Sequence, residues 1–169
     1  MRAIVIYGST TGLTEKLSQS VATSLLIPGW YVCHKNVKDT HAAELNGYDL
    51  IVMGCSTWGH GELQEDFIPF EGELRGVSLK GKKASVFGAG SKSYPHFCAA
   101  VDILEQSLKD CGAQIVSTPL KIDEGYEAPF QKIAVWAKDI SETMSRSSLR
   151  TDDPGKGQES LAPDLGLGV

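Results

Sequence analysis

The chain has 169 residues, of which 41% are hydrophobic and 22% are charged, and its formal net charge at pH 7 is −5. This length is typical of one domain, and the balance excludes a disordered, collagen-like or coiled-coil chain. An acidic chain without clustered lysine and arginine is not expected to bind nucleic acid. No apolar run approaches the ~18 residues of a membrane span, so we expect no membrane segment.

Five short apolar runs recur along the chain, at residues 3–7, 30–33, 50–53, 83–87 and 115–122. They do not alternate with polar residues, which is typical of strands that are buried on both faces. Periodicity near 3.6 residues predicts helices over residues 14–26, 97–111 and 126–144. Strands that alternate with helices predict an α/β fold of parallel β-α-β units, with helices on both faces of one sheet.

Both ends of the chain bear on its location and extent. The first apolar run is shorter than the ~7–15 residues of a signal-peptide core, and the four cysteines form no C-x-x-C pair, which predicts reduced thiols in a cytoplasmic protein. From residue 146 to residue 169 glycine, serine, proline and charge dominate. We therefore predict one domain over residues 1–145 and a flexible C-terminal tail over residues 146–169. The alternative is a docking peptide with apolar side chains at Leu161, Leu165, Leu167 and Val169.

The first of three polar loops follows the first predicted strand, at residues 8–15. It reads Gly-Ser-Thr-Thr-Gly-Leu-Thr-Glu and has hydroxyls at positions 9, 10, 11 and 14. Glycines allow a sharp turn, and backbone N–H groups at the start of a helix bind anions. An ordinary N-cap would need only one hydroxyl, so the loop predicts a phosphate site. Hydrolysis of nucleoside triphosphates is not expected, because Leu13 stands where the Walker pattern has lysine.

The second and third loops follow the third and fourth predicted strands. The second, residues 54–63, contains Trp58, which suits either stacking on a planar ligand or a plug over the end of the sheet. Its His60 has no neighbour spaced to form a metal site with it, so we expect no metal. The third loop, residues 88–98, adds a second aromatic residue, Tyr94. Ligands of open parallel sheets bind at the carboxyl ends of the strands, so the three loops predict a site for a flat ring with a phosphate tail.

Four segments carry a resemblance to a known family. They are Tyr-Gly-Ser-Thr-Thr-Gly-Leu-Thr-Glu at 7–15, Gly-Cys-Ser-Thr-Trp-Gly at 54–59, Glu-Leu-Gln-Glu-Asp-Phe-Ile-Pro at 62–69, and Ser-Tyr-Pro-His-Phe-Cys-Ala-Ala-Val-Asp at 93–102. Over residues 1–145 the chain resembles flavodoxin, most closely the short-chain type of sulfate-reducing bacteria. The resemblance implies a flavodoxin-like three-layer sandwich with a five-stranded parallel sheet in the order known for that family, 2-1-3-4-5.

The resemblance also implies a function. It indicates a low-potential one-electron carrier that cycles non-covalently bound FMN between semiquinone and hydroquinone, without catalytic residues of its own. Its partners would be redox proteins such as cytochromes, reductases, hydrogenases or oxidoreductases, and it would be a cytoplasmic monomer. Two alternatives stay open: an FMN-dependent oxidoreductase such as a quinone reductase, and a flavodoxin-like protein that binds FMN weakly.

Position by position, the resemblance implies the following contacts with FMN. The first loop would hold the phosphate, the second the ribityl chain and ring, and the third the ring and its pyrimidine edge. Trp58 and Tyr94 would enclose the ring, and the Gly59 carbonyl would turn to accept a hydrogen bond from flavin N5. The implied cofactor-binding residues are Ser9, Thr10, Thr11, Gly12, Leu13, Thr14, Ser56, Thr57, Trp58, Gly59, His60, Gly61, Gly90, Ser91, Tyr94, His96, Phe97 and Cys98.

The sequence departs from the family pattern at four positions: Leu13, His60, Ser91 and Lys92. The last three put fewer negative and more positive charges near the ring. We therefore expect full reduction to be easier than is usual for the family. Acidic residues are concentrated over residues 62–75, which predicts either a solvated face or a negative rim that steers basic redox partners.

Overall fold

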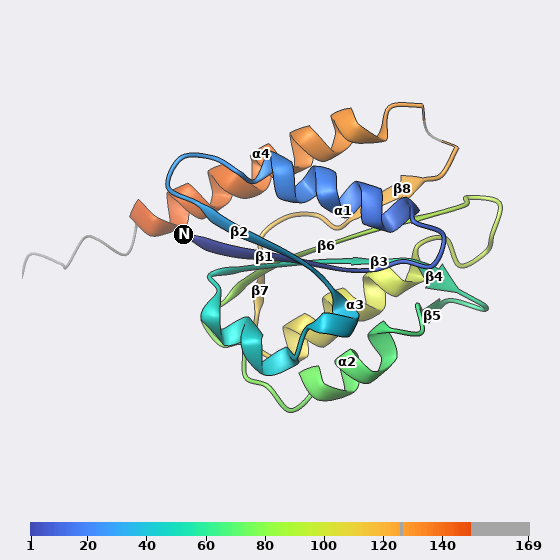
Figure 1. Ribbon diagram of the computed structural model, residues 1–169, viewed down its shortest axis with the longest axis horizontal. Helices are drawn as coiled ribbons and strands as arrows, with labels where there is room; N and C mark the ends of the chain where they lie inside the picture. The colour runs from blue at the N-terminus through green and yellow to red at the C-terminus, as the bar shows by residue number, and fades with distance from the viewer. Residues whose placement is uncertain (126, 150–169) are drawn as a thin grey trace, which may run out of the picture.

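Parallel strands form the centre of the computed structural model, which describes residues 1–125 and 127–149. The strand order is β2-β1-β3-β6-β7, and β8 also pairs with β6 (Figure 1). With β7 and β8 together in the fifth position, this is the predicted order 2-1-3-4-5. The strands are β1 (Arg2–Gly8), β2 (Tyr31–Asn36), β3 (Leu50–Cys55), β6 (Lys83–Gly90), β7 (Gln114–Ile115) and β8 (Leu120–Asp123).

The fifth position of the sheet differs from the expectation, because the run at residues 115–122 forms two strands rather than one. β7 pairs with the start of β6 and β8 with its end, so both lie on the same side of it. Between them Ser117 bonds to Ser85 at 2.8 Å through their hydroxyls, instead of continuing the backbone ladder. Pro119, which has no N–H to donate, precedes β8.

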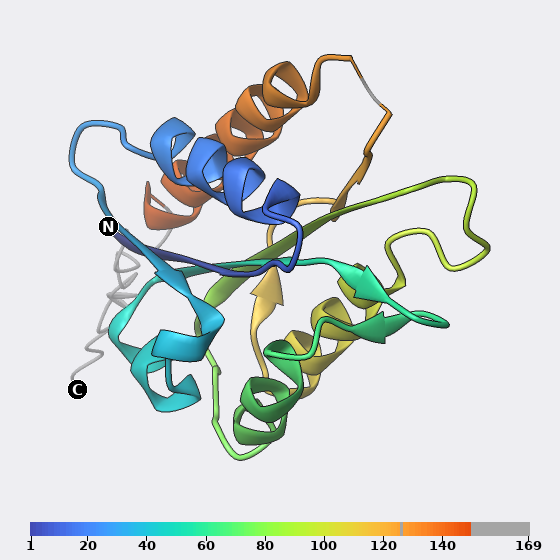
Figure 2. The ribbon, with the colours of Figure 1, turned by 45° about the vertical axis from the view of Figure 1, so that its right-hand side comes forward.

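Helices cover both faces of the sheet, as the alternation of strands and helices predicted. The helices α1 (Leu13–Ser24) and α4 (Pro129–Leu149) pack on one face. On the other face lie α2 (Phe67–Leu74), α3 (Ala99–Asp110) and the short helix η2 (Ala42–Gly47), which follows η1 (Val37–Asp39) (Figures 1 and 2). The three-layer sandwich is thereby confirmed.

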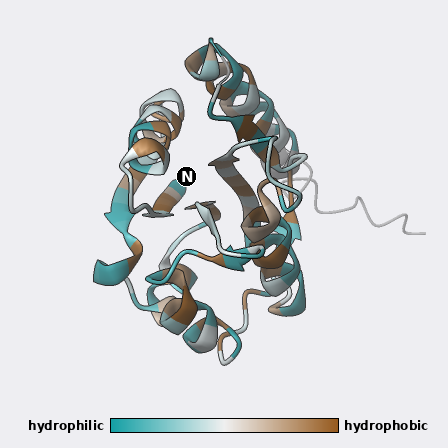
Figure 3. Ribbon diagram, turned by 90° about the vertical axis from the view of Figure 1, so that its right-hand side faces the viewer, coloured by the Kyte–Doolittle hydropathy of each residue, from teal (hydrophilic) through white to brown (hydrophobic). Residues whose placement is uncertain are grey.

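Two apolar clusters hold the layers together, and successive residues of each central strand belong to different ones. In β1, Ala3 and Val5 face α1 and α4, whereas Ile4 and Ile6 face α2 and α3. All four are fully buried, which explains the absence of polar alternation in these strands. Figure 3 shows the central strands mostly in the colour of hydrophobic residues between the helices.

The C-terminal helix packs one of its sides on the sheet and continues past residue 145. Ile133, Trp136 and Ile140 are buried against the sheet, whereas Phe130 and Val135 are exposed on the outer side of α4. The helix ends at Leu149, beyond the domain boundary that we expected at residue 145. The rest of the predicted tail, residues 150–169, lies outside the described residues. Within the part of the chain that is described, no helix has the length and apolar character needed to cross a membrane.

Tyr7, His34, Ser18 and Glu15 form a polar cluster where β1, β2 and α1 meet. The rings of Tyr7 and His34 stack with 4.9 Å between their centroids, and Nε2 of His34 lies 2.7 Å from Oγ of Ser18. The Ser18 hydroxyl donates to the carbonyl oxygen of Glu15, so its oxygen accepts the N–H of the imidazole. Burial lowers the pKa of His34, with a smaller opposing effect from the charge of Glu15.

We expect this histidine to make the protein less stable in mild acid. The unfolded chain takes up a proton at an ordinary pKa of about 6.5, whereas the folded chain keeps His34 neutral to a lower pH. Its contribution is therefore complete above the unfolded pKa and is lost as the pH falls through the window down to the folded pKa. Urea unfolding of the purified protein at about pH 7.5 and about pH 5.5 measures the loss. His34→Gln should reduce the difference, and an unchanged difference in that variant would contradict the expectation.

Candidate functional site

The three predicted loops meet at the carboxyl-terminal edge of the sheet, where they enclose a cavity of about 610 Å³. This volume is within the range of small-molecule sites. Figure 2 shows the loops after β1, β3 and β6 on the same side of the molecule, together with the loop after β8. The cavity is lined by Thr10, Thr11, Leu13, Thr14, Ser56, Thr57, Trp58, Gly59, His60, Ala89, Gly90, Ser91, Tyr94, Pro95, His96, Phe97, Cys98 and Glu124.

The first loop turns sharply into α1 at Gly12, whose φ of 85° lies in the left-handed region that favours glycine. The N–H of Gly12 donates to Oγ of Ser9 at 3.1 Å, which closes the turn. Gly8, at the end of β1, cannot be replaced without displacement, since a Cβ there would lie 2.6 Å from the Phe67 ring. The start of the loop therefore packs directly against Phe67 of α2, and the first turn of α1 is directed at the cavity.

Hydroxyl groups and helix N–H groups are the polar features of this end of the cavity. Thr14 is only 1% exposed, and its Oγ1 lies 2.8 Å from Oγ of Ser56, which joins the first loop to the second. Among the described residues that line the cavity, none is lysine or arginine. A phosphate here would therefore be bound by neutral donors and by the positive end of the α1 dipole.

The second loop forms a small hairpin that was not expected from the sequence. β4 (Thr57–Trp58) pairs antiparallel with β5 (Glu62–Leu63). Between them Gly59 and Gly61 have φ of 49° and 111°, and the N–H of Gly61 donates to the Trp58 carbonyl at 2.9 Å. The carboxylate of Glu62 accepts the N–H of His60 at 2.6 Å. The hairpin fixes the backbone of Trp58, whose side chain is 38% exposed on the cavity wall.

The second and third loops are joined to each other as well. Oγ1 of Thr57 accepts the N–H of Ala100 at 3.1 Å, so the second loop caps the start of α3. A Cβ on Gly61 would lie 3.3 Å from the side chain of His96, which shows how closely the two loops pass. Cys98, at the start of α3, adopts a left-handed φ of 51° although it is not glycine. Burial raises the pKa of its thiol to about 11, so it is uncharged at neutral pH.

The third loop presents Tyr94 to the cavity, with 68% of its surface exposed. Its tip is shaped by hydrogen bonds within the loop: the carbonyl of Ser91 accepts the N–H of Tyr94, and Oγ of Ser91 accepts that of Ser93. The Ser91 side chain is therefore engaged in its own turn. Lys92 is tied to the end of β8, because its N–H donates to the carboxylate of Asp123 at 3.4 Å.

All but three of the predicted site residues line the cavity; the exceptions are Ser9, Gly12 and Gly61, which shape the turns behind it. Ala89, Pro95 and Glu124 line it without having been predicted. Glu124 follows the fifth strand position, and its N–H donates to the carbonyl of Gly90 at 2.9 Å. Applying the strand-exit rule to that last strand would have found it.

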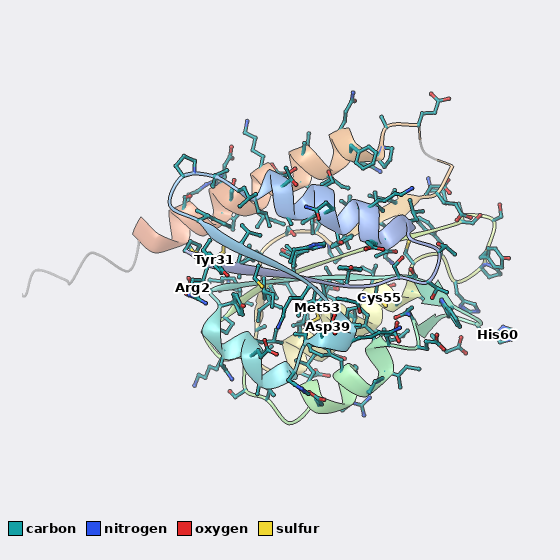
Figure 4. The ribbon with its side chains drawn as sticks, in the orientation of Figure 1. Arg2, Tyr31, Asp39, Met53, Cys55 and His60 are labelled. Carbon is teal, nitrogen blue, oxygen red and sulfur yellow. The ribbon has the colours of Figure 1, made fainter. Side chains whose placement is uncertain are left out.

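Glu124 changes the charge balance that was expected from Ser91 and Lys92. Glu124 lines the cavity, and the carboxylate of Asp123 lies against the backbone of Lys92. Figure 4 shows His60 at the far right of the molecule, at the opposite end of the sheet from Arg2 and Tyr31. The expectation of easier full reduction stays a prediction, and it now depends on the balance between Lys92 and these two carboxylates.

Most carboxylates of the acidic segment 62–75 bind groups within the chain. Glu62 binds the backbone of His60, and Asp66 pairs with Lys38 at 3.2 Å. Glu71 is buried between α2 and α3, where the Arg75 guanidinium and then the Ser107 hydroxyl hold its pKa below the usual range. The Glu71–Arg75 ion pair lies at a second cavity, of about 690 Å³, and among the described residues that line this cavity none is aromatic.

Comparison with known proteins agrees with this geometry. The flavodoxin family model matches residues 5–136 of the chain. Flavodoxin from Maridesulfovibrio salexigens is 44% identical over 146 residues, which cover 85% of this chain and 99% of that protein. Oxidised flavodoxin 1 from Bacillus cereus has a TM-score of 0.81 at 29% identity and covers 84% of this chain and 98% of its own. Fusobacterium nucleatum flavodoxin bound to flavin mononucleotide shares the fold, with a TM-score of 0.73 at 16% identity over 83% of this chain and 97% of its own.

Proposed function

Because this chain belongs to the flavodoxin family, we propose that the cavity between its three loops is the site at which it holds FMN. The protein is a small FMN-binding electron carrier, and its partners are other redox proteins. Its relatives include flavodoxins of sulfate-reducing bacteria, as the motifs indicated. The observation that supports the site is that one cavity brings together a helix start with hydroxyl side chains and the aromatic side chains of Trp58 and Tyr94.

The residues present fit the cofactor at both of its ends. At one end, Thr10, Thr11 and Thr14 supply neutral donors beside the first turn of α1, which suits a phosphate that carries two negative charges near neutral pH. At the other end, Trp58 and Tyr94 supply flat apolar surfaces for a ring system. Bound FMN supplies one-electron chemistry, and the chain's own part is to bind it, orient it and restrict water.

Several finer properties belong to the same proposal. We take the protein to be a cytoplasmic monomer whose domain ends with α4, with no catalytic residue of its own. Glu62 lies in the hairpin beside Trp58, so it contributes negative charge near the exposed edge of the site. A basic patch on a cytochrome or a reductase would meet that charge, and such encounters are fast, weak and sensitive to salt.

A visible spectrum followed through stepwise reduction with dithionite tests the function. We expect the purified protein, loaded with FMN, to be reduced in two separate one-electron steps with distinct potentials. A single two-electron step with steady turnover of NAD(P)H would instead support an FMN enzyme such as a quinone reductase. A chain that FMN cannot reconstitute would contradict the carrier function.

The same titration measures the lower of the two potentials. A value less negative than that of Maridesulfovibrio salexigens flavodoxin, measured in parallel, would agree with the expectation of easier full reduction. The positive charge of Lys92 would then outweigh the negative charge of Glu124 near the ring. A value equal or more negative would overturn that expectation and leave the carrier function intact.

A further inference from the structure

Gln64 is a buried polar residue directly behind the first loop. It follows β5, is only 1% exposed and does not line the cavity. Its Oε1 lies against the end of β1, since a Cβ on Gly8 would be 2.5 Å from that oxygen. Buried amides are retained where all their hydrogen bonds are made, so the partners of this one define what it does.

Asp66 fixes the orientation of the Gln64 amide from both sides. Nε2 of Gln64 donates to Oδ2 of Asp66 at 2.7 Å, and Oε1 accepts the backbone N–H of the same residue at 3.1 Å. A rotated amide would place oxygen against carboxylate and NH₂ against N–H, so both bonds would become repulsive. Lys38 holds the carboxylate in place through its other oxygen, at 3.2 Å.

The fixed amide determines the direction of the Thr10 hydroxyl. The second hydrogen on Nε2 is directed to Oγ1 of Thr10, 3.4 Å away. An amide nitrogen only donates, so the threonine oxygen accepts here and its own hydrogen is left to donate elsewhere. Thr10 lines the cavity at the end where the other hydroxyls lie.

We propose that Gln64, locked by Asp66, is a positioning residue that makes Thr10 a dedicated hydrogen-bond donor to the phosphate of FMN. This rests on the proposed function, since it assigns a role toward the cofactor placed in that cavity. It extends the site to residues behind the cavity wall, as far as Lys38 in η1, outside the three loops. It also gives Gln64 and Asp66, two polar residues of the acidic segment, a part in cofactor selection.

The expected signature is a loss of preference for FMN over riboflavin, which lacks the phosphate. Gln64→Met keeps the length of the side chain but removes its donors, so the Thr10 hydroxyl is no longer directed outward. Gln64→Glu turns a donor into an acceptor and adds a negative charge beside the loop. Losing a hydrogen bond to a charged group corresponds to about tenfold in affinity, so we expect Kd for FMN to rise about tenfold or more and Kd for riboflavin to stay the same.

Fluorescence titration of the flavin-free full chain with FMN and with riboflavin provides the test. Glu65→Gln is the matched control, because it changes an exposed neighbour and should alter neither Kd. Thr10→Val tests whether Gln64 acts through the Thr10 hydroxyl: in that background, Gln64→Met should not raise the Kd for FMN any further. Should Gln64→Met fail to fold, Asp66→Asn keeps the size of its side chain and releases the amide, with the same expected loss of preference.

The outcomes separate this role from a structural one. An equal weakening of FMN and riboflavin, or an undiminished effect of Gln64→Met in the Thr10→Val background, would overturn the inference. So would unchanged titrations of every variant. If the unaltered protein itself bound no FMN, or bound riboflavin as tightly, the proposed phosphate site would fail first and this inference with it.

Discussion

Gly54→Ala is expected to destabilise the fold by about 3 kcal/mol or more, because the central strand has no room for a methyl group there. A Cβ at this position would lie 2.1 Å from Cζ of Phe87. Phe87 is fully buried and faces Gly54 in the register of β3 and β6. Its ring is also packed edge to face against Trp136, with 6.0 Å between centroids, so it cannot move away. Urea unfolding of the flavin-free protein measures the change.

Gly72→Ala is the matched control for that substitution. Gly72 lies within α2, and a Cβ there meets nothing within 4 Å. Alanine is favoured over glycine inside a helix, so this change should stabilise the protein by up to about 1 kcal/mol. Phe87→Leu should recover part of the loss in a double variant with Gly54→Ala. A Gly54→Ala protein within about 1 kcal/mol of the unaltered chain would show that the sheet can relax there.

The pairing of Gly54 with Phe87 illustrates what a sequence does not contain. Apolar runs reveal both strands, but the register that places one residue opposite another is a property of the assembled sheet. The same holds for Gln64. In the sequence it lies within an acidic segment, where a solvated face is the ordinary interpretation, and only the packing of β5 behind the first loop buries it.

The site itself was largely predictable, because the rule for its position depends only on strand order and direction. Loops that follow parallel strands lie at one edge, so three polar loops were expected to meet there. Glu124 was not predicted because the rule was applied to the loops after the first, third and fourth strands and not to the exit of the last strand, which Glu124 follows. The hairpin at Trp58 was also missed, because strands of two residues leave no periodic signal.

Trp58→Ala is expected to weaken FMN binding by about 2–4 kcal/mol, or roughly 30- to 1,000-fold in Kd. The indole is held on the cavity wall by the hairpin and is 38% exposed, whereas Tyr94, another aromatic residue of the cavity, is 68% exposed. Because the protein already packs against most of Trp58, its indole is held in place before a ring binds, whereas the more exposed Tyr94 loses conformational freedom on binding. Tyr94→Ala should therefore cost less than Trp58→Ala.

Riboflavin and a distant aromatic residue complete this test. Trp58 would contact the ring rather than the phosphate, so its loss should weaken riboflavin by the same factor as FMN, in contrast to Gln64→Met. Tyr31→Ala removes an aromatic side chain that is 56% exposed at the opposite end of the sheet, and it should leave both titrations unchanged (Figure 4). If Trp58→Ala bound FMN within about threefold of the unaltered protein, Trp58 would be a plug over the sheet rather than a wall of the flavin site.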